Sequence, residues 1–180
     1  MRKTTLIALL ATALVGLGCG AATTEGAGDA SGGDGEGKAD KPAAKAAKVA
    51  KIGDPARDGK FEFTVKSTKC GVRKVGNDLL GATAQGQFCL VTLKVKNIGK
   101  ESQMFDGSSQ KAYSADGTEY SADGAAGLYA NENAETFLND INPGNQVTGV
   151  VVFDIPKKVK LTKLELHDSP FSGGVTVALD

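Results

Sequence analysis

The sequence predicts an all-β domain, an antiparallel β-sandwich, over residues 52–180. Three observations predict it. Several short runs alternate between apolar and polar residues, which is typical of strands with one buried face. Turn-forming Gly, Asn, Asp and Pro separate these runs. About 130 residues of such sequence suit one sandwich domain, and no second domain is indicated.

The strands are expected where the alternation is clearest. Residues 89–96 place Cys89, Val91, Leu93 and Val95 on one face, and residues 147–155 show the same period of two. A hairpin is expected around Asp116-Gly117, because Asp-Gly favours tight hairpin turns. Helical character is expected only in parts of 125–137. The remaining strands are expected over 61–65, 164–167 and 175–179.

Composition narrows the class of protein. The chain has 180 residues, with 21 Lys and Arg balancing 21 Asp and Glu. Zero net charge argues against a nucleic-acid partner, since such proteins usually carry a basic excess. The apolar share of 41% is enough for a core, while 24 glycines and no Trp indicate turns, loops or linkers.

The N-terminus predicts export. Arg2 and Lys3 precede an uncharged, mostly apolar stretch over residues 5–17, which suits a signal peptide and is short for a membrane span. The sequence Val-Gly-Leu-Gly that leads to Cys19 resembles the lipobox of bacterial lipoproteins, although Gly16 stands where Leu is usual. The resemblance implies cleavage after residue 18 and a diacylglycerol on Cys19. The alternative is an ordinary secretory signal that is cut elsewhere, with Cys19 incidental.

Residues 19–51 are expected to be a disordered Gly/Ala/Lys-rich tether. Residues 20–37 contain no aromatic or large aliphatic side chain and therefore cannot form a core. Lysines at 38, 41, 45, 48 and 51 suggest contact with anionic lipids, but nearby acids balance them and favour a simple solvated tether. As a Gly-rich coil this segment would span about 30 Å. The expected location is the extracytoplasmic face of the membrane, through the lipid anchor.

The two remaining cysteines predict a structural disulfide. Cys70 and Cys89 each lie on or at the end of an expected strand, and exported proteins commonly oxidise such pairs. Closing a loop of this size stabilises a fold by about 3 kcal/mol in the chain-entropy model. A redox or metal-binding pair has no support, because neither a C-x-x-C spacing nor a nearby His is present.

Several segments together resemble a known family. In order these are 59–65, 86–97, Asp116-Gly117, Asn142-Pro143-Gly144 and 151–156. They resemble a bacterial family of extracytoplasmic domains of unknown function that is common in lipoproteins. The resemblance covers residues 52–180. It implies a telokin-like, immunoglobulin-like sandwich, similar in fold to the secreted immunoprotective antigen of mycobacteria. It implies no catalytic residues and leaves the function open.

Catalytic and metal-binding motifs have little support. A hydrolase would need a nucleophile beside His167, the one candidate base, but no Gly-x-Ser-x-Gly elbow occurs. We expect His167 on the solvent face of a strand, alternating with Lys163 and Glu165. A calcium site at Asp116, Glu119 and Asp123 is disfavoured, because EF-hand spacing is absent and Asp-Gly already favours a turn. No metal and no cofactor are expected.

The functional expectation is a non-catalytic binding module for an unknown protein or envelope ligand. Tyr129 and Phe137 are the candidate binding residues, because they lie in the least regular stretch of the domain. The alternative for this pair is that it plugs one end of the core. Soluble ligand capture would require a large apolar pocket. The rival functions are a passive structural or stress-related envelope protein and a small hydrolase that uses His167.

Overall fold

The computed structural model describes residues 49–77, 79–133 and 136–180. The predicted signal peptide (1–18), Cys19 and the predicted tether up to residue 48 lie outside them. The end of that tether is described, and it differs from the expectation. Ala50–Lys51 form strand β1, which pairs in parallel with the last strand, so regular structure begins before residue 52.

Strands dominate the described chain, with one 3₁₀ turn (η1) and one short helix (α1). The elements are β1 (Ala50–Lys51), β2 (Pro55–Asp58), β3 (Phe61–Gly76), β4 (Gly81–Asn97), β5 (Gln103–Met104), η1 (Gly107–Ser109), β6 (Lys111–Ser114), β7 (Glu119–Ser121), α1 (Gly124–Ala130), β8 (Asp140–Ile141), β9 (Gln146–Ile155), β10 (Leu161–Leu166) and β11 (Val175–Ala178).

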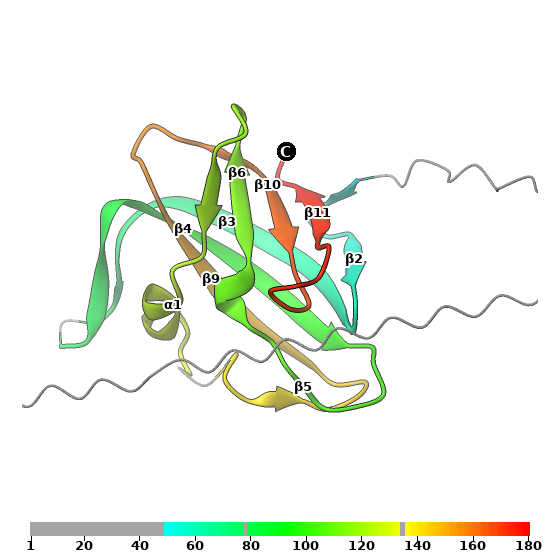
Figure 1. The fold of residues 1–180 in the computed structure, drawn as a ribbon. Helices are drawn as coiled ribbons and strands as arrows, with labels where there is room; N and C mark the ends of the chain where they lie inside the picture. Colours follow the sequence, from blue (N-terminus) through cyan, green and yellow to red (C-terminus); the bar gives the residue numbers. More distant parts are fainter. Residues whose placement is uncertain (1–48, 78, 134–135) are drawn as a thin grey trace, which may run out of the picture. The chain divides into compact units, whose positions relative to one another are not determined.

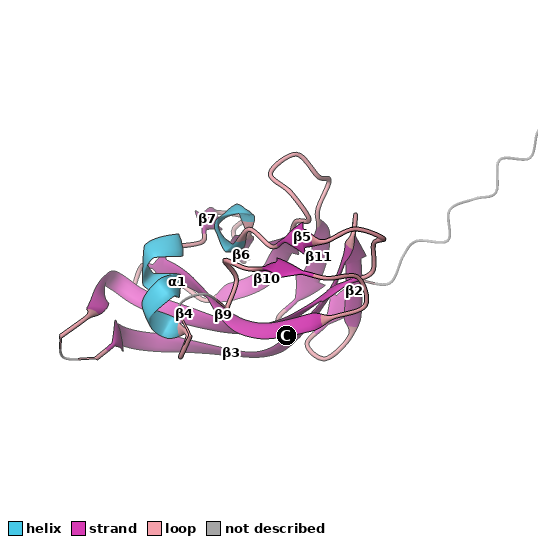
Figure 2. Cartoon of the chain, turned by 90° about the horizontal axis from the view of Figure 1, so that it is seen from below, coloured by secondary structure: helices cyan, strands magenta, loops and turns pink. Residues whose placement is uncertain are grey.

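Two main sheets form the sandwich. The first sheet has the order β1-β11-β10-β6-β7, and the second sheet has the order β2-β3-β4-β9. Figure 1 shows the strands in sequence colours, and Figure 2 shows the two sheets as separate layers. Apart from the parallel β1–β11 pair, the ladders in both sheets are antiparallel. The predicted antiparallel β-sandwich is therefore confirmed, as is the β6–β7 hairpin.

The main core lies between the sheets and follows the predicted alternation. Cys89, Val91, Leu93 and Val95 are all buried along β4. Phenylalanines give the core its bulk: the ring centroids of Phe61 and Phe105 lie 6.0 Å apart in an edge-to-face arrangement, which aromatic pairs favour. The alternation in the sequence therefore predicted the buried face of β4 correctly.

Strands β3 and β4 run past this core as a two-stranded arm, defined here as residues 66–76 and 81–88. The register between the strands is irregular between Lys69 and Val72, where Gly71 has a φ of 86°. Cys70 of the arm is joined to Cys89 by a disulfide. Helix α1 packs beside the arm in a second buried cluster that contains Val75, Phe88, Ala126 and Val152.

Candidate functional site

An apolar pocket of about 300 Å³ lies beside helix α1 and is the strongest candidate site in the described chain. Pockets of this size and character are typical of small-ligand sites. Three segments that are far apart in sequence form it. They are 104–108 around η1, the described residues of 122–138 around α1, and the centre of β9 over 150–152. The lining residues are Met104, Phe105, Asp106, Gly107, Ser108, Ala122, Asp123, Gly124, Gly127, Leu128, Asn131, Phe137, Leu138, Val150, Val151 and Val152.

The floor of the pocket is the outer edge of β9, whose other edge pairs with β4. Outer-edge backbone groups of this strand have partners from the α1 segment. The Asp123 amide donates to the Val152 carbonyl at 2.7 Å. The Asn131 side chain pairs with Val150 in both directions, at 2.7 Å from the Val150 amide and 3.0 Å from its carbonyl. The helix segment therefore covers an edge that could otherwise pair with another chain.

Local sequence explains why a helix forms here. The Asp123 carboxylate accepts from the Ala126 amide at 2.9 Å, which is the contact of a helix N-cap. At the other end, the Asn131 side chain donates to the Gly127 carbonyl at 2.8 Å. Asp123-Gly124, which reads as a turn in the sequence, is thus a helix start. The small residue Ala126 is fully buried, so α1 sits close to the sheet.

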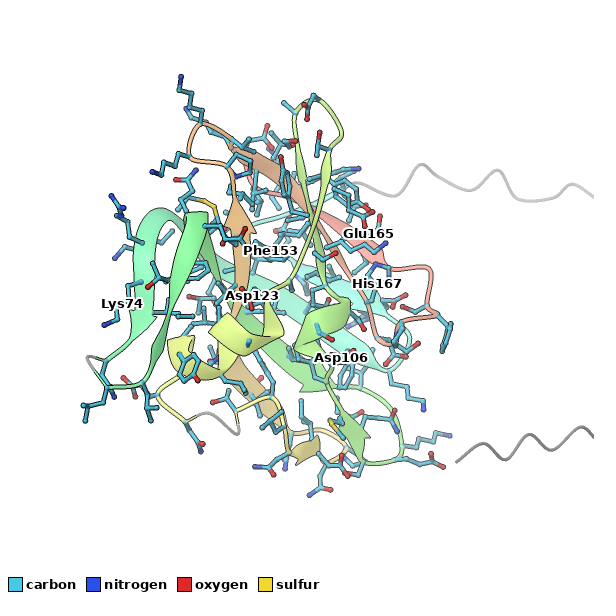
Figure 3. The ribbon with its side chains drawn as sticks, turned by 60° about the vertical axis from the view of Figure 1, so that its left-hand side comes forward. Lys74, Asp106, Asp123, Phe153, Glu165 and His167 are labelled. Carbon is cyan, nitrogen blue, oxygen red and sulfur yellow. A yellow bond between two sulfur atoms is a disulfide. The ribbon has the colours of Figure 1, made fainter. Side chains whose placement is uncertain are left out.

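The η1 wall is fixed by Asp106. Its carboxylate accepts from the Ser108 amide and hydroxyl at 2.8 and 2.6 Å and from the Ser109 hydroxyl. Burial alone would raise the pKa of Asp106, but the hydrogen bonds from Ser108 and Ser109 outweigh burial and hold that pKa below its ordinary value. Asp106 and Asp123, both labelled in Figure 3, therefore cap two short helical turns.

Apolar side chains form the remaining wall and the rim. Phe137 packs edge-on against Phe105, with centroids 4.8 Å apart. A Cβ on Gly149 would lie 2.6 Å from the Phe137 ring, so only glycine allows this ring to lie against β9. At the rim Met104, Leu128 and Leu138 are 58%, 41% and 55% exposed. The pocket is therefore open, and its mouth is apolar.

The two predicted binding residues separate in the structure. Phe137 lines the pocket and packs against the main core. Tyr129 is exposed on α1 and does not line the pocket. The alternative that the pair plugs one end of the core fits Phe137, which packs against the core and also lines the pocket. It does not fit Tyr129, which is exposed. Sequence reasoning missed the rim residues, of which only Leu128, beside Tyr129, lay in a segment already singled out.

His167 differs from its expectation. It follows β10 and is 7% exposed, so it is buried and does not lie on a solvent face. Its Nε2 lies 3.0 Å from Glu165 Oε1, and its Nδ1 lies 3.4 Å from the Ser172 hydroxyl (Figure 3 shows His167 and Glu165). The physical reason for the burial is that the loop over 168–174 folds back on the ring. A Cβ on Gly174 would lie 2.6 Å from its Cε1.

The contacts of Ser172, His167 and Glu165 tie the loop over 168–174 to the end of β10. The Ser172 hydroxyl donates to the Ser169 carbonyl at 3.0 Å, a closer acceptor than the His167 ring at 3.4 Å. A serine nucleophile must instead give its proton to the base. The backbone of His167 is also held, because its amide donates to Gln110 Oε1 at 2.8 Å and its carbonyl accepts from Gln110 Nε2 at 3.0 Å.

The acidic residues considered for calcium have other partners. Asp116 closes the hairpin turn by accepting from the Ser114 hydroxyl and the Thr118 amide, and the Ser114 bond lowers the pKa of Asp116. Asp123 caps α1. Among the described side chains, no group of three or more His, Cys, Asp or Glu is placed to hold a metal ion. Of the helical segments described, none has the length and apolar character needed to cross a membrane.

Comparisons with known proteins agree with this fold. The uncharacterized protein YxkC of Bacillus subtilis (strain 168) is 34% identical over 123 residues, which cover 64% of this chain and 67% of that protein. Among solved structures, the yjhA protein from Bacillus subtilis matches with a TM-score of 0.51 and 17% identity over 73% of this chain and 100% of its own. The secreted protein MPT63 from Mycobacterium tuberculosis matches with a TM-score of 0.52 and 18% identity, over 74% and 96%.

The expected likeness in fold to a secreted mycobacterial protein is thereby confirmed. A family model described as "Domain of unknown function (DUF4352)" matches residues 50–177, which include the strands from β1 to β10 and most of β11. As expected from the sequence, this family is one of domains of unknown function. The chain belongs to the DUF4352 family.

Proposed function

We propose that the chain is an exported lipoprotein whose sandwich domain acts as a non-catalytic binding module at the cell envelope. The observation that carries the binding role is the open pocket beside α1. Its walls are largely apolar, and Met104, Leu128 and Leu138 are exposed at its mouth. Exposed apolar clusters around a cavity mark binding surfaces. The ligand class that fits is an apolar group, such as an alkyl chain or the apolar side chain of an envelope component.

Binding is favoured over catalysis because the carboxylates that line the pocket already have hydrogen-bond partners. The two carboxylates in the pocket lining, Asp106 and Asp123, are engaged in capping contacts. General acid–base chemistry needs a titratable group within reach of substrate, with a pKa near the working pH. The lowered pKa of Asp106 moves it away from that range. These groups therefore support a pocket that holds a ligand without transforming it.

The pocket can be tested with a variant that fills it. Gly127 lines the pocket, and a Cβ built on it meets no heavy atom within 4 Å. Gly127→Leu should therefore occupy the cavity without a clash, and Leu also favours a helix over Gly by about 1 kcal/mol. We expect 1-octanol to shift the backbone NMR signals of residues 127–131 and 150–152 in the natural chain, and to leave them unshifted in Gly127→Leu.

The control is Ile98→Ser, since Ile98 is an exposed apolar side chain that does not line the pocket. This variant should respond to 1-octanol as the natural chain does. If octanol shifts no signals around α1, or shifts them equally in Gly127→Leu, the binding role fails. A passive envelope protein would then be the better account.

The anchored location is tested separately. Cys19→Ser removes the thiol that would carry the lipid, and two or more acyl chains are needed for stable anchoring. We expect the mass of the natural protein to exceed that of its peptide chain by a diacylglycerol, and the variant to lack this addition and to leave the membrane fraction. A membrane-bound variant with no mass difference beyond the substitution would contradict lipidation.

Hydrolysis at His167 is a second candidate, because the two ring nitrogens of His167 contact the Ser172 hydroxyl and the Glu165 carboxylate. Ser172→Ala tests it directly. Turnover of p-nitrophenyl acetate that is above the uncatalysed rate and is lost in this variant would support a hydrolase. We expect the variant and the natural chain to be equal, because the Ser172 hydroxyl proton is directed to the Ser169 carbonyl.

A further inference from the structure

The turn that joins β3 and β4 presents two leucines to solvent. Leu79 is 93% exposed and Leu80 is 64% exposed. They lie at the end of the arm, away from the pocket lining and from both buried clusters. Two adjacent exposed leucines on a hairpin carry a solvation penalty that burial elsewhere would relieve. A surface that receives them is therefore the natural explanation.

The leucines are held in this position by a structured turn. The Asn77 side-chain oxygen accepts from the Leu79 amide at 2.9 Å and from the Leu80 amide at 2.8 Å, and the Asn77 amide donates to the Leu80 carbonyl at 2.7 Å. Gly76 has a φ of 90°, and a Cβ there would lie 2.3 Å from the Leu80 carbonyl oxygen. The backbone of the turn is therefore closed, while its apolar side chains point outward.

Positive charge lies along the strand that leads to this turn. Strand β3 contributes the exposed residues Lys66, Lys69, Arg73 and Lys74 within the arm. The arm residues of β4 carry no charged side chain, and Asp78 is the one acid in the sequence from 66 to 88. A chain with zero net charge thus concentrates a basic excess behind its most exposed leucine pair.

We propose that the β3–β4 turn docks into an anionic lipid surface, with Leu79 and Leu80 in the acyl boundary and the arm's basic residues among the headgroups. The order of side chains along the arm, from the turn inward, supports this contact. Apolar side chains come first and cations follow, as they do in interfacial anchors. Lys and Arg keep their charge at the headgroup level while their stems cover apolar surface. An anionic membrane complements both features at once.

The arm is suited to this contact because it is braced. The Cys70–Cys89 disulfide ties its two strands together, and helix α1 packs against it through Ala126 and Phe88. A rigid hairpin loses little conformational freedom on insertion. In Figures 1 and 2 the turn lies at the opposite end of the domain from β2. Residues 20–48 span at most about 100 Å when extended, so a lipid on Cys19 leaves room for either end to reach the bilayer.

The absence of Trp from the chain allows a local optical probe. Leu79→Trp in the full, lipidated protein places a single indole at the turn, where 93% exposure makes the change harmless to the fold. When the protein is reconstituted into phosphatidylglycerol vesicles, the fluorescence of this indole should shift to shorter wavelength and be quenched by brominated lipids. Ile98→Trp is the control at an exposed site away from the arm, and its emission should not change.

Three comparisons can overturn the proposal. No quenching in phosphatidylglycerol rejects membrane docking, and equal quenching in phosphatidylcholine rejects selection of an anionic surface. A concentration-dependent shift without vesicles assigns the turn to a second copy of the chain. Adding Arg73→Gln should lower the ratio of inserted to free turn by about 5-fold. Vesicle flotation reports the Cys19 anchor independently, so failure of the anchor and failure of the turn are distinguishable.

Discussion

The most informative single residue in the fold is Gln110, a fully buried amide between η1 and β6. Its Nε2 donates to the Asp106 carbonyl at 2.8 Å and to the His167 carbonyl at 3.0 Å, and its Oε1 accepts from the His167 amide. One side chain therefore satisfies backbone groups of η1 and of the segment after β10. Polar groups buried without such partners are costly.

Gln110→Leu should be strongly destabilising. The substitution keeps similar bulk but leaves three buried backbone contacts unmade, so we expect the free energy of unfolding to fall by about 2–4 kcal/mol. Urea unfolding followed by circular dichroism measures this loss. Gln146→Leu, at an exposed position of β9, is the matched control and should change stability by less than about 0.5 kcal/mol. Equal effects of the two substitutions would contradict the structural role of Gln110.

Tyr113 gives the fold a specific alkaline sensitivity. Burial, a hydrogen bond to Glu119 at 2.9 Å and the nearby charge of Glu165 raise the pKa of Tyr113 to about 12. The folded pKa lies above the unfolded value of about 10. The resulting stabilisation is therefore complete below pH 10 and is lost as the pH rises towards 12.

Tyr113→Phe should remove this component of the pH dependence. The difference in stability between the natural chain and the variant should be constant below about pH 10 and should shrink above it, because only the natural chain has this phenol to ionise. Chemical unfolding on both sides of pH 10 measures the difference. A constant difference up to pH 12 would show that the Tyr113 phenol is not perturbed by folding.

The sequence identified apolar core residues better than buried polar ones. Alternation in β4 predicts the buried face from Cys89 to Val95, because a strand exposes successive side chains to opposite faces. No comparable pattern marks Gln110 or His167, whose burial depends on partners distant in the chain. The expectation that His167 faces solvent failed for this reason, since a period of two says nothing about a loop that folds over the strand end.

At the level of elements, the main surprise is the length of β3. Alternation in the sequence predicts a strand over 61–65, whereas the strand continues to Gly76. Residues 66–74 are mostly polar or charged, so they show no buried face of their own. Pairing with β4 and packing against α1 support them instead. Contacts of this kind override local propensity and are invisible in a single segment.

Asn131 protects the outer edge of β9, and Asn131→Ala should expose it. The variant loses side-chain bonds to the Val150 amide, the Val150 carbonyl and the Gly127 carbonyl, so we expect a loss of about 1–3 kcal/mol. An uncovered edge strand also invites pairing between chains. Unfolding and light scattering together test both effects. Thr148→Ala, an exposed change on the same strand, should leave both measurements unchanged.

At the scale of the whole molecule, the sequence predicted the architecture and a family of domains of unknown function, but not the pocket. The sandwich architecture can be predicted because each strand shows its own alternation of apolar and polar residues, which can be recognised in one short segment. The pocket requires that 104–108, the described residues of 122–138, and 150–152 lie together in space, and no local pattern predicts that they do. Of the two candidate binding residues, the structure places Phe137 in the lining of this pocket and Tyr129 outside it, and binding at either residue stays a prediction; Met104 and the β9 floor were not expected.

The proposed binding role is centred on the apolar pocket beside α1. The most direct test is native mass spectrometry of the chain purified from its own host, compared with Gly127→Leu. We expect the natural chain to carry an added mass from an apolar ligand, and the variant, equally folded by circular dichroism, to lack it. If no added mass is found on the natural chain, or if the same mass stays on Gly127→Leu, the pocket is not the binding site.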